Sequence, residues 1–90
     1  MVEHDQRELT SAIRQYIIDD FLLDEGELDD DTSLLESGII DSTGAMEIVS
    51  FLETTFGIEV DDEDLVADNL DSVARLTRFV AGKQSAHARS

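Results

Sequence analysis

The sequence predicts an all-α fold: a small four-helix bundle with a long ordered loop between the first two helices and a short third helix. Apolar residues recur every three or four positions around residues 9–21, 45–56 and 73–80. No proline interrupts the 90 residues, and no useful stretch shows the alternation of a half-buried strand. This length suits one domain, expected over residues 1–82, and residues 83–90 have no apolar pattern and are expected to form a disordered tail.

The first helix is predicted to begin after Asp5, because Asp5 and Glu8 have the spacing of a capping box. The apolar stripe that follows consists of Leu9, Ala12, Ile13, Tyr16 and Ile17. It continues to Phe21, and we expect the helix to end between Phe21 and Gly26. Tyr16 is interpreted as an aromatic residue at the edge of the core, with its hydroxyl in water.

The second helix is predicted to begin where Asp41 and Ser42 follow a polar loop. Asp41 is suited to be the N-cap, which leaves Ser42 at the first helical position. The inward stripe is Ala45, Ile48, Val49, Leu52 and Phe56, and Gly57 suits a left-handed C-terminal cap. The Ser42 hydroxyl would then point outward at the positive end of the helix dipole, where a phosphodiester is favoured.

The connection over residues 24–41 has no clear periodicity and is long for a compact domain. Apolar residues within it are expected to hold it in order against the bundle: Leu28, Leu34, Leu35, Ile39 and Ile40. Gly38 would permit a backbone turn shortly before Ser42.

The last third of the chain is predicted to contain the short third helix and the final helix. The acidic residues 61–64 are placed to cap and charge the first turn of the third helix, which runs through Leu65 and Val66. Asp71 or Ser72 then caps the final helix. Its inward side is Val73, Leu76, Phe79 and Val80.

The formal charge of −16 is unevenly distributed, since the interval between Arg14 and Arg75 holds nineteen Asp and Glu and no Lys, Arg or His. Such a field repels nucleic acid and anionic lipid and accelerates encounter with basic protein surfaces. We therefore expect no nucleic-acid partner. Neither a secretory signal nor a long apolar run is present, so we expect a monomeric cytoplasmic protein without membrane insertion.

No residues are placed for catalysis or metal binding. There is no cysteine and no Gly-x-Ser-x-Gly elbow, and His4 and His87 lie near the termini, away from Ser42. The acidic runs at 29–31 and 61–64 lack the spacing of a calcium loop. We therefore expect that the protein is not an enzyme and that Ser42 is acted upon by another protein.

The residues around Ser42 resemble the signature region of the acyl and peptidyl carrier proteins. The matching positions are Leu34-Leu35, Gly38-Ile39-Ile40-Asp41-Ser42, Met46, Val49, Leu52 and Phe56-Gly57-Ile58-Glu59-Val60. The resemblance covers about residues 6–81. It implies a four-helix bundle in which a phosphopantetheinyl transferase attaches phosphopantetheine from coenzyme A to Ser42, beside the helix cap Asp41. An acyl or aminoacyl group would then be held on the arm as a thioester.

One departure from the family concerns the residues after the serine, where many fatty-acid and polyketide carriers have leucine and this chain has Thr43 and Gly44. The run is more similar to discrete carriers loaded by a stand-alone adenylating ligase, including D-alanyl and other aminoacyl carrier proteins. After loading, a downstream transferase or synthase with a basic docking surface would be the next partner of the carrier. The alternatives are a fatty-acyl or polyketide acyl carrier protein and, from another class, an unmodified acidic helical binding module.

The second helix is the expected surface for partner recognition, with Thr43, Met46, Glu47 and Glu53 as the candidate contacts. Met46 suits adaptable partner pockets, and the glutamates suit partner Arg or Lys. A buried core position for Met46 is equally compatible with the sequence. The resemblance also implies that Ile58 and Val60 flank the path of the arm.

Overall fold

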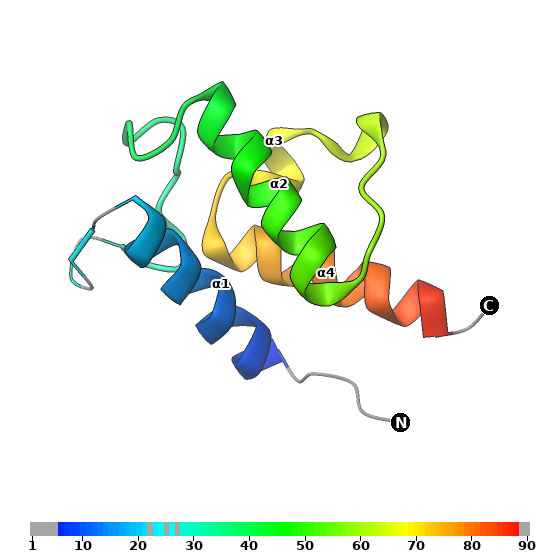
Figure 1. Cartoon of the computed structure of the whole chain (residues 1–90). Helices are drawn as coiled ribbons and strands as arrows, with labels where there is room; N and C mark the ends of the chain where they lie inside the picture. The colour runs from blue at the N-terminus through cyan, green and yellow to red at the C-terminus, as the bar shows by residue number, and fades with distance from the viewer. Residues whose placement is uncertain (1–5, 22, 25, 27, 89–90) are drawn as a thin grey trace.

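The structure is a computed structural model that describes residues 6–21, 23–24, 26 and 28–88. Within these residues the chain is all-helical, with α1 over Gln6–Asp20, α2 over Ser42–Phe56, α3 over Ala67–Leu70 and α4 over Val73–Ala88 (Figure 1). A short 3-10 helix, η2, covers Asp62–Asp64. The predicted all-α bundle with a short third helix is confirmed.

The first and last helices form the closest pair in the bundle, and α3 and α2 also pack against α4 (Figure 1). Fully buried side chains come from every long helix and from the loop before α2: Leu9, Ile13, Ile17, Leu28, Leu34, Ile48, Leu52, Val73, Leu76 and Val80. Burial of each large apolar side chain contributes about 1.5–3 kcal/mol, so these stripes hold the bundle together. In the described segments, no helix has both the length and the apolar character needed to cross a bilayer.

The ends of α1 and α2 lie close to the predicted positions. α1 ends at Asp20, one residue before the expected range, and the Phe21 amide still donates to the Ile17 carbonyl at 3.0 Å. Its predicted cap, Asp5, lies outside the described residues. Gly57 closes α2 in the left-handed conformation, at φ 67°, as predicted.

The prediction that the third helix runs through Leu65 and Val66 is wrong. The acids before them form η2 instead, a tight turn in which the Asp61 amide donates to the Asp64 carboxylate at 3.0 Å. Leu65 and Val66 then leave the helical region, with Val66 extended at φ −127° and ψ 153°. α3 begins only after Val66, at Ala67, because the acidic side chains bond their own turn and close it early.

Residues 83–88 of the expected disordered tail are helical instead, because α4 continues to Ala88, and residues 89–90 lie outside the described residues. Lys83 Nζ lies 2.7 Å from Asp64 Oδ2, 3.7 Å from Asp61 Oδ2 and 5.7 Å from the centre of the Phe79 ring. These contacts tie the last part of α4 to η2. A search for apolar periodicity misses them, because they are made by charged groups.

The structure also shows which residue caps α4 and which apolar residues of the loop are buried. Ser72, not Asp71, caps α4, since its hydroxyl accepts from the Arg75 amide at 3.1 Å. In the loop, Leu28, Leu34 and Ile40 are buried as predicted, and Ile39 is half-buried. The expectation for Leu35 is wrong: its side chain is 45% exposed.

Candidate functional site

The N-terminal end of α2 presents a serine hydroxyl to solvent. Asp41 is the N-cap, with extended backbone and with its Oδ1 atom accepting from the Gly44 amide at 2.8 Å, as predicted. Ser42 is the first helical residue, and it is exposed. Among the described residues, none forms a hydrogen bond with the Ser42 hydroxyl.

The surroundings of this hydroxyl suit a phosphodiester. Besides the cap Asp41, the first turn of α2 contains no acidic residue, so no carboxylate within the turn opposes a second negative charge. The free amides and the dipole of a 15-residue helix favour that charge. The residues present therefore fit a phosphate ester on Ser42.

The loop that leads to Ser42 is held by Asp71, at the junction of α3 and α4. The Asp71 carboxylate accepts from the Ser33 hydroxyl at 2.6 Å and from the Leu35 amide at 3.0 Å. The backbone carbonyl of Asp71 accepts from the Leu34 amide at 2.8 Å. Asp71 therefore positions the loop instead of capping α4. Its partners lie 36 to 38 residues earlier in the chain, so local sequence patterns carry no signal for this role.

A turn at Gly38 aims the chain into α2. Gly38 has φ 80°, a left-handed conformation that favours glycine, and its amide donates to the Leu35 carbonyl at 3.2 Å. The Ile40 amide then donates to the Leu34 carbonyl at 3.1 Å, and the Ile40 side chain enters the core. The turn predicted at Gly38 is confirmed.

The first turn of α2 lies directly on Phe21 and Ile40. The sequence analysis names both residues as apolar but does not predict this contact. A Cβ atom at Gly44 would lie 3.1 Å from Phe21 Cε1 and 3.2 Å from Ile40 Cβ. Gly44 is therefore needed for close packing beneath Ser42. The available signal was a glycine inside an otherwise regular helical pattern, which often marks a close approach.

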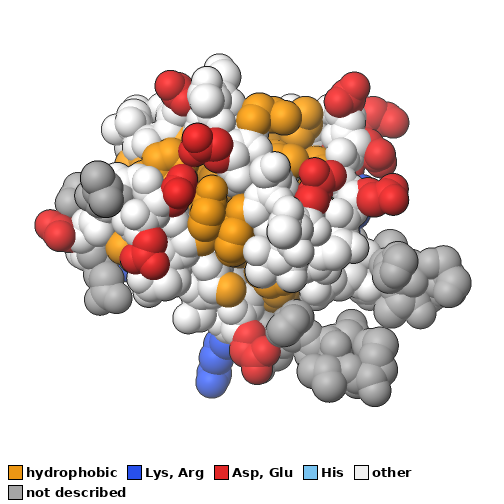
Figure 2. Space-filling view, viewed as in Figure 1, with side chains coloured by type: hydrophobic (Ala, Val, Ile, Leu, Met, Phe, Trp, Pro, Cys, Tyr) orange, Lys and Arg blue, Asp and Glu red, His pale blue; other side chains and the backbone are white. Residues whose placement is uncertain are grey.

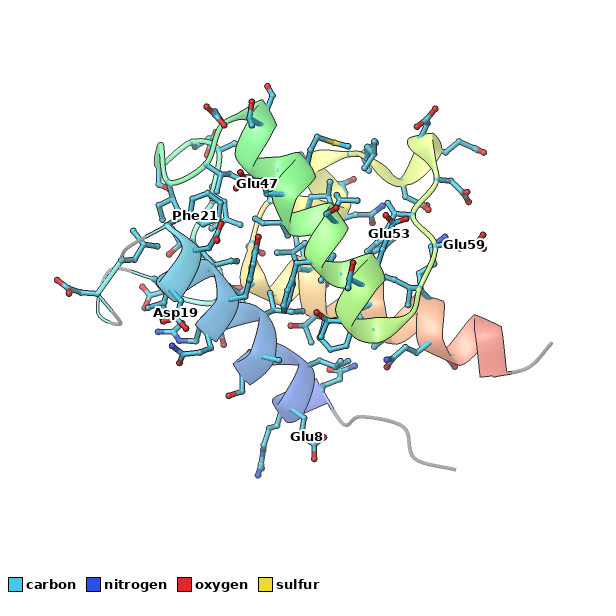
Figure 3. All side chains as sticks on the ribbon, viewed as in Figure 1. Glu8, Asp19, Phe21, Glu47, Glu53 and Glu59 are labelled. Carbon is cyan, nitrogen blue, oxygen red and sulfur yellow. The ribbon has the colours of Figure 1, made fainter. Side chains whose placement is uncertain are left out.

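The predicted recognition residues Thr43, Met46, Glu47 and Glu53 are all exposed. Met46 is 53% exposed, which settles its position at the surface and not in the core. Helical spacing places Ser42, Met46 and Glu53 on one flank of α2. Figure 3 shows Glu53 near the segment that follows α2, and its carboxylate accepts from the Val60 amide at 3.0 Å.

Glu47 is not brought together with Met46 and Glu53. It lies on the flank of α2 that faces the C-terminal part of α1 (Figure 3), where its carbonyl accepts from the Tyr16 hydroxyl at 3.3 Å. Burial, and next the nearby carboxylates of Asp20 and Glu47, raise the pKa of Tyr16. Tyr16 is half-buried, at the core edge as predicted.

The segment after α2 is anchored at both ends. At its start, Ile58 is buried and Val60 is half-buried. At its end, Lys83 of α4 donates a hydrogen bond to Asp64, and this bond lowers the pKa of Asp64 and raises the pKa of Lys83. In the described part of the chain, no group of three or more His, Asp or Glu is arranged to hold a metal ion.

Comparison with known proteins identifies the family. Residues 11–80 match the family described as the phosphopantetheine attachment site. An acyl carrier protein of Rubrobacter xylanophilus is 29% identical over 82 residues, which cover 91% of this chain and 99% of the relative. A D-alanyl carrier protein of Streptococcus pyogenes serotype M1 is 32% identical over 66 residues, which cover 73% of this chain and 82% of the relative.

The matched residues 11–80 include Ser42 and all of α2, together with parts of α1 and α4. The match favours a modified carrier over the unmodified acidic binding module. The prosthetic group of the family is covalently attached phosphopantetheine, and the carrier itself performs no catalysis. The chain therefore belongs to the phosphopantetheine-binding carrier proteins.

Proposed function

We propose that this chain is a discrete carrier protein that holds an acyl or aminoacyl group as a thioester on a phosphopantetheine arm attached to Ser42. The observation that supports this most directly is the exposed Ser42 hydroxyl at the first position of α2, inside the matched region. A serine hydroxyl is a weak nucleophile without a base, so a separate phosphopantetheinyl transferase must activate it.

The chain's own residues fix the point of attachment. Asp41 caps the helix and sets the first turn, and Asp71 holds the loop that leads to it. When bound, the arm supplies a thiol that carries the cargo as a thioester. A cargo delivered on a short tether reaches a docked partner at high effective concentration, so the carrier contributes position and recognition.

We propose that a stand-alone ATP-dependent adenylating ligase loads the arm and that a downstream transferase or synthase receives the cargo. The Thr43-Gly44 pair after the serine and the similarity to D-alanyl carrier proteins support this choice. Met46 and Glu53 would contact partners on the Ser42 flank, with Thr43 beside them and Glu47 on the other flank. Attachment of the arm needs coenzyme A and loading of the arm needs ATP, so we place the protein in the cytoplasm, as a monomer kept apart by its charge of −16.

Intact-mass measurement tests the attachment site. The purified chain, incubated with coenzyme A and a broad-specificity transferase, should gain the mass of one phosphopantetheine. Ser42→Ala should abolish the gain, and Ser50→Ala should keep it, since Ser50 is also an exposed serine of α2. An unmodified wild type, or a Ser42→Ala variant that still gains the group, would defeat the proposal.

A fatty-acyl or polyketide role is the second candidate, favoured by the match to an acyl carrier protein over 91% of this chain. Two loading reactions on the modified protein separate the candidates. A D-alanine carrier ligase with D-alanine and ATP should add one alanyl group, whereas a malonyl transferase with malonyl-coenzyme A should add little. The reverse result would assign the chain to the acyl branch.

A further inference from the structure

A groove runs between α1 and α2, on the flank of α2 away from Ser42. It is an open hollow of about 470 Å³, lined mainly by Gln15, Tyr16, Asp19, Asp20, Phe51 and Thr55. In the described part of the chain the backbones of α1 and α2 make little direct contact, so side chains alone form the floor. Figure 2 shows apolar side chains reaching the surface between the two helices. We call this hollow the α1–α2 groove.

The floor of the groove contains a pair of stacked aromatic rings. The rings of Tyr16 and Phe51 stack with their centroids 3.9 Å apart and an interplanar angle of 10°, and Phe56 meets Phe51 edge-on at 5.9 Å. Tyr16 and Phe51 are only half-buried, so part of each ring borders the hollow. The exposed parts of the two rings give the floor an apolar contact surface.

The rim of the groove is acidic. Asp19 accepts from Gln15 Nε2 at 2.9 Å and Asp20 from the Tyr16 hydroxyl at 3.4 Å, so both carboxylates border the aromatic floor. No Lys or Arg lines the groove, and no cation of the described residues pairs with either carboxylate. Both acids also lie in the last turn of α1, where the helix dipole disfavours negative charge. The hydrogen bonds from Gln15 and Tyr16 offset part of this cost, and among the described residues the negative charge of the rim remains without a cation.

The properties of the groove disfavour two occupants that this chain itself could supply. A second copy would bring a charge of −16 and the same acidic rim, which opposes contact. An arm on Ser42 would start on the opposite flank, since Phe51 is nine residues further along the helix and half a turn around it from Ser42. An apolar, cationic occupant from another protein fits both floor and rim.

We propose that the α1–α2 groove is a second docking surface, which binds a partner-protein helix whose apolar face is bordered by Arg or Lys. The apolar face packs on Tyr16 and Phe51, and the cations pair with Asp19 and Asp20. This surface is separate from the Ser42 flank and does not depend on modification, so a partner engages the carrier there whether or not the arm is loaded.

Tyr16 provides a direct assay, because the chain has one tyrosine and no tryptophan. The probe is a synthetic amphipathic helix of Leu and Arg without aromatic residues. It should change Tyr16 emission saturably and protect the ring from acrylamide quenching, and the same peptide with Gln for Arg should bind roughly tenfold more weakly at low salt. Ser42→Ala should bind the Arg peptide like the wild type, which separates this proposal from the attachment proposal.

A matched pair of double variants tests where the charge acts. D19N/D20N should weaken binding roughly fivefold, whereas E59Q/E63Q, with the same change in charge on the segment after α2, should weaken it less than twofold. All four residues are exposed, so both variants should fold. Equal losses in the two variants, or an unchanged Tyr16 signal, would overturn the proposal.

Two further results would also overturn it by naming another occupant. A Tyr16 signal that changes with protein concentration alone would assign the groove to a second copy. Protection of Tyr16 on attachment of phosphopantetheine, without peptide, would assign it to the arm.

Discussion

Replacing Asp41 by alanine removes the cap on which the geometry of Ser42 depends. The change leaves the Gly44 amide without the acceptor it now has at 2.8 Å. Loss of an N-cap of this kind costs about 1 kcal/mol of folding free energy. At about 2.1 cal/mol/K per residue, 90 residues have an unfolding entropy near 0.19 kcal/mol/K, so Tm should fall by about 5 °C.

Asp41→Asn is the matched control, because asparagine accepts the same hydrogen bond without the charge. Its Tm should stay within about 2 °C of wild type, since Asn and Asp are nearly equal as caps. Urea unfolding followed by far-UV circular dichroism gives the free energies, and amide exchange at Gly44 should speed up only in the alanine variant. If the asparagine variant loses as much as the alanine variant, the charge and not the hydrogen bond stabilises α2, and the reasoning fails.

Three further results are expected. Gly44→Val should destabilise the protein by about 1–3 kcal/mol in urea unfolding, because its side chain would press on Phe21 and Ile40, and an unchanged midpoint would contradict that close packing. Lys83→Met should lower Tm, and the loss should be larger at neutral pH than at strongly acidic or alkaline pH. The lowered pKa of Asp64 adds stability that is complete above its unfolded value of 3.8 and is lost as the pH falls through the lower folded value. The raised pKa of Lys83 adds stability that is complete below 10.5 and is lost as the pH rises through the higher folded value. A difference from wild type that is equally large at neutral pH and at both extremes would refute the pairing. Sodium and magnesium chloride at equal ionic strength should raise Tm equally by screening the charge of −16, and indifference to salt would show that repulsion is unimportant.

The sequence predicted α1, α2 and the inward face of α4 because each has a local pattern that the structure uses. Ile13 and Ile48 lie where a 3.6-residue period places them, and both are buried. Asp41 and Gly57 delimit α2 because an N-cap and a left-handed C-cap require only neighbouring residues. These elements depend on information within one or two turns of helix.

The remaining features depend on contacts between distant residues. Asp71 has side-chain chemistry that suits a cap, and only the packing of the loop brings it to Ser33. Lys83 extends α4 through an ion pair with Asp64, which a search for apolar residues does not detect. The separation of Glu47 from Glu53 follows from their spacing of six residues, which is about 120° around a helix. Only the packing of α1 shows that the Glu47 side of α2 meets Tyr16.

The pairing of α1 with α4, together with the bonds from Asp71 back to Ser33 and Leu35, has a consequence for the order of events during synthesis. The first helix leaves the ribosome long before the helix that covers its apolar stripe, and an isolated helix of 15 residues is marginal in water. The residues before α4 therefore lack most of their packing partners until α4 has been made. Such a chain gains its structure in one concerted step once α4 is available, not helix by helix as it emerges.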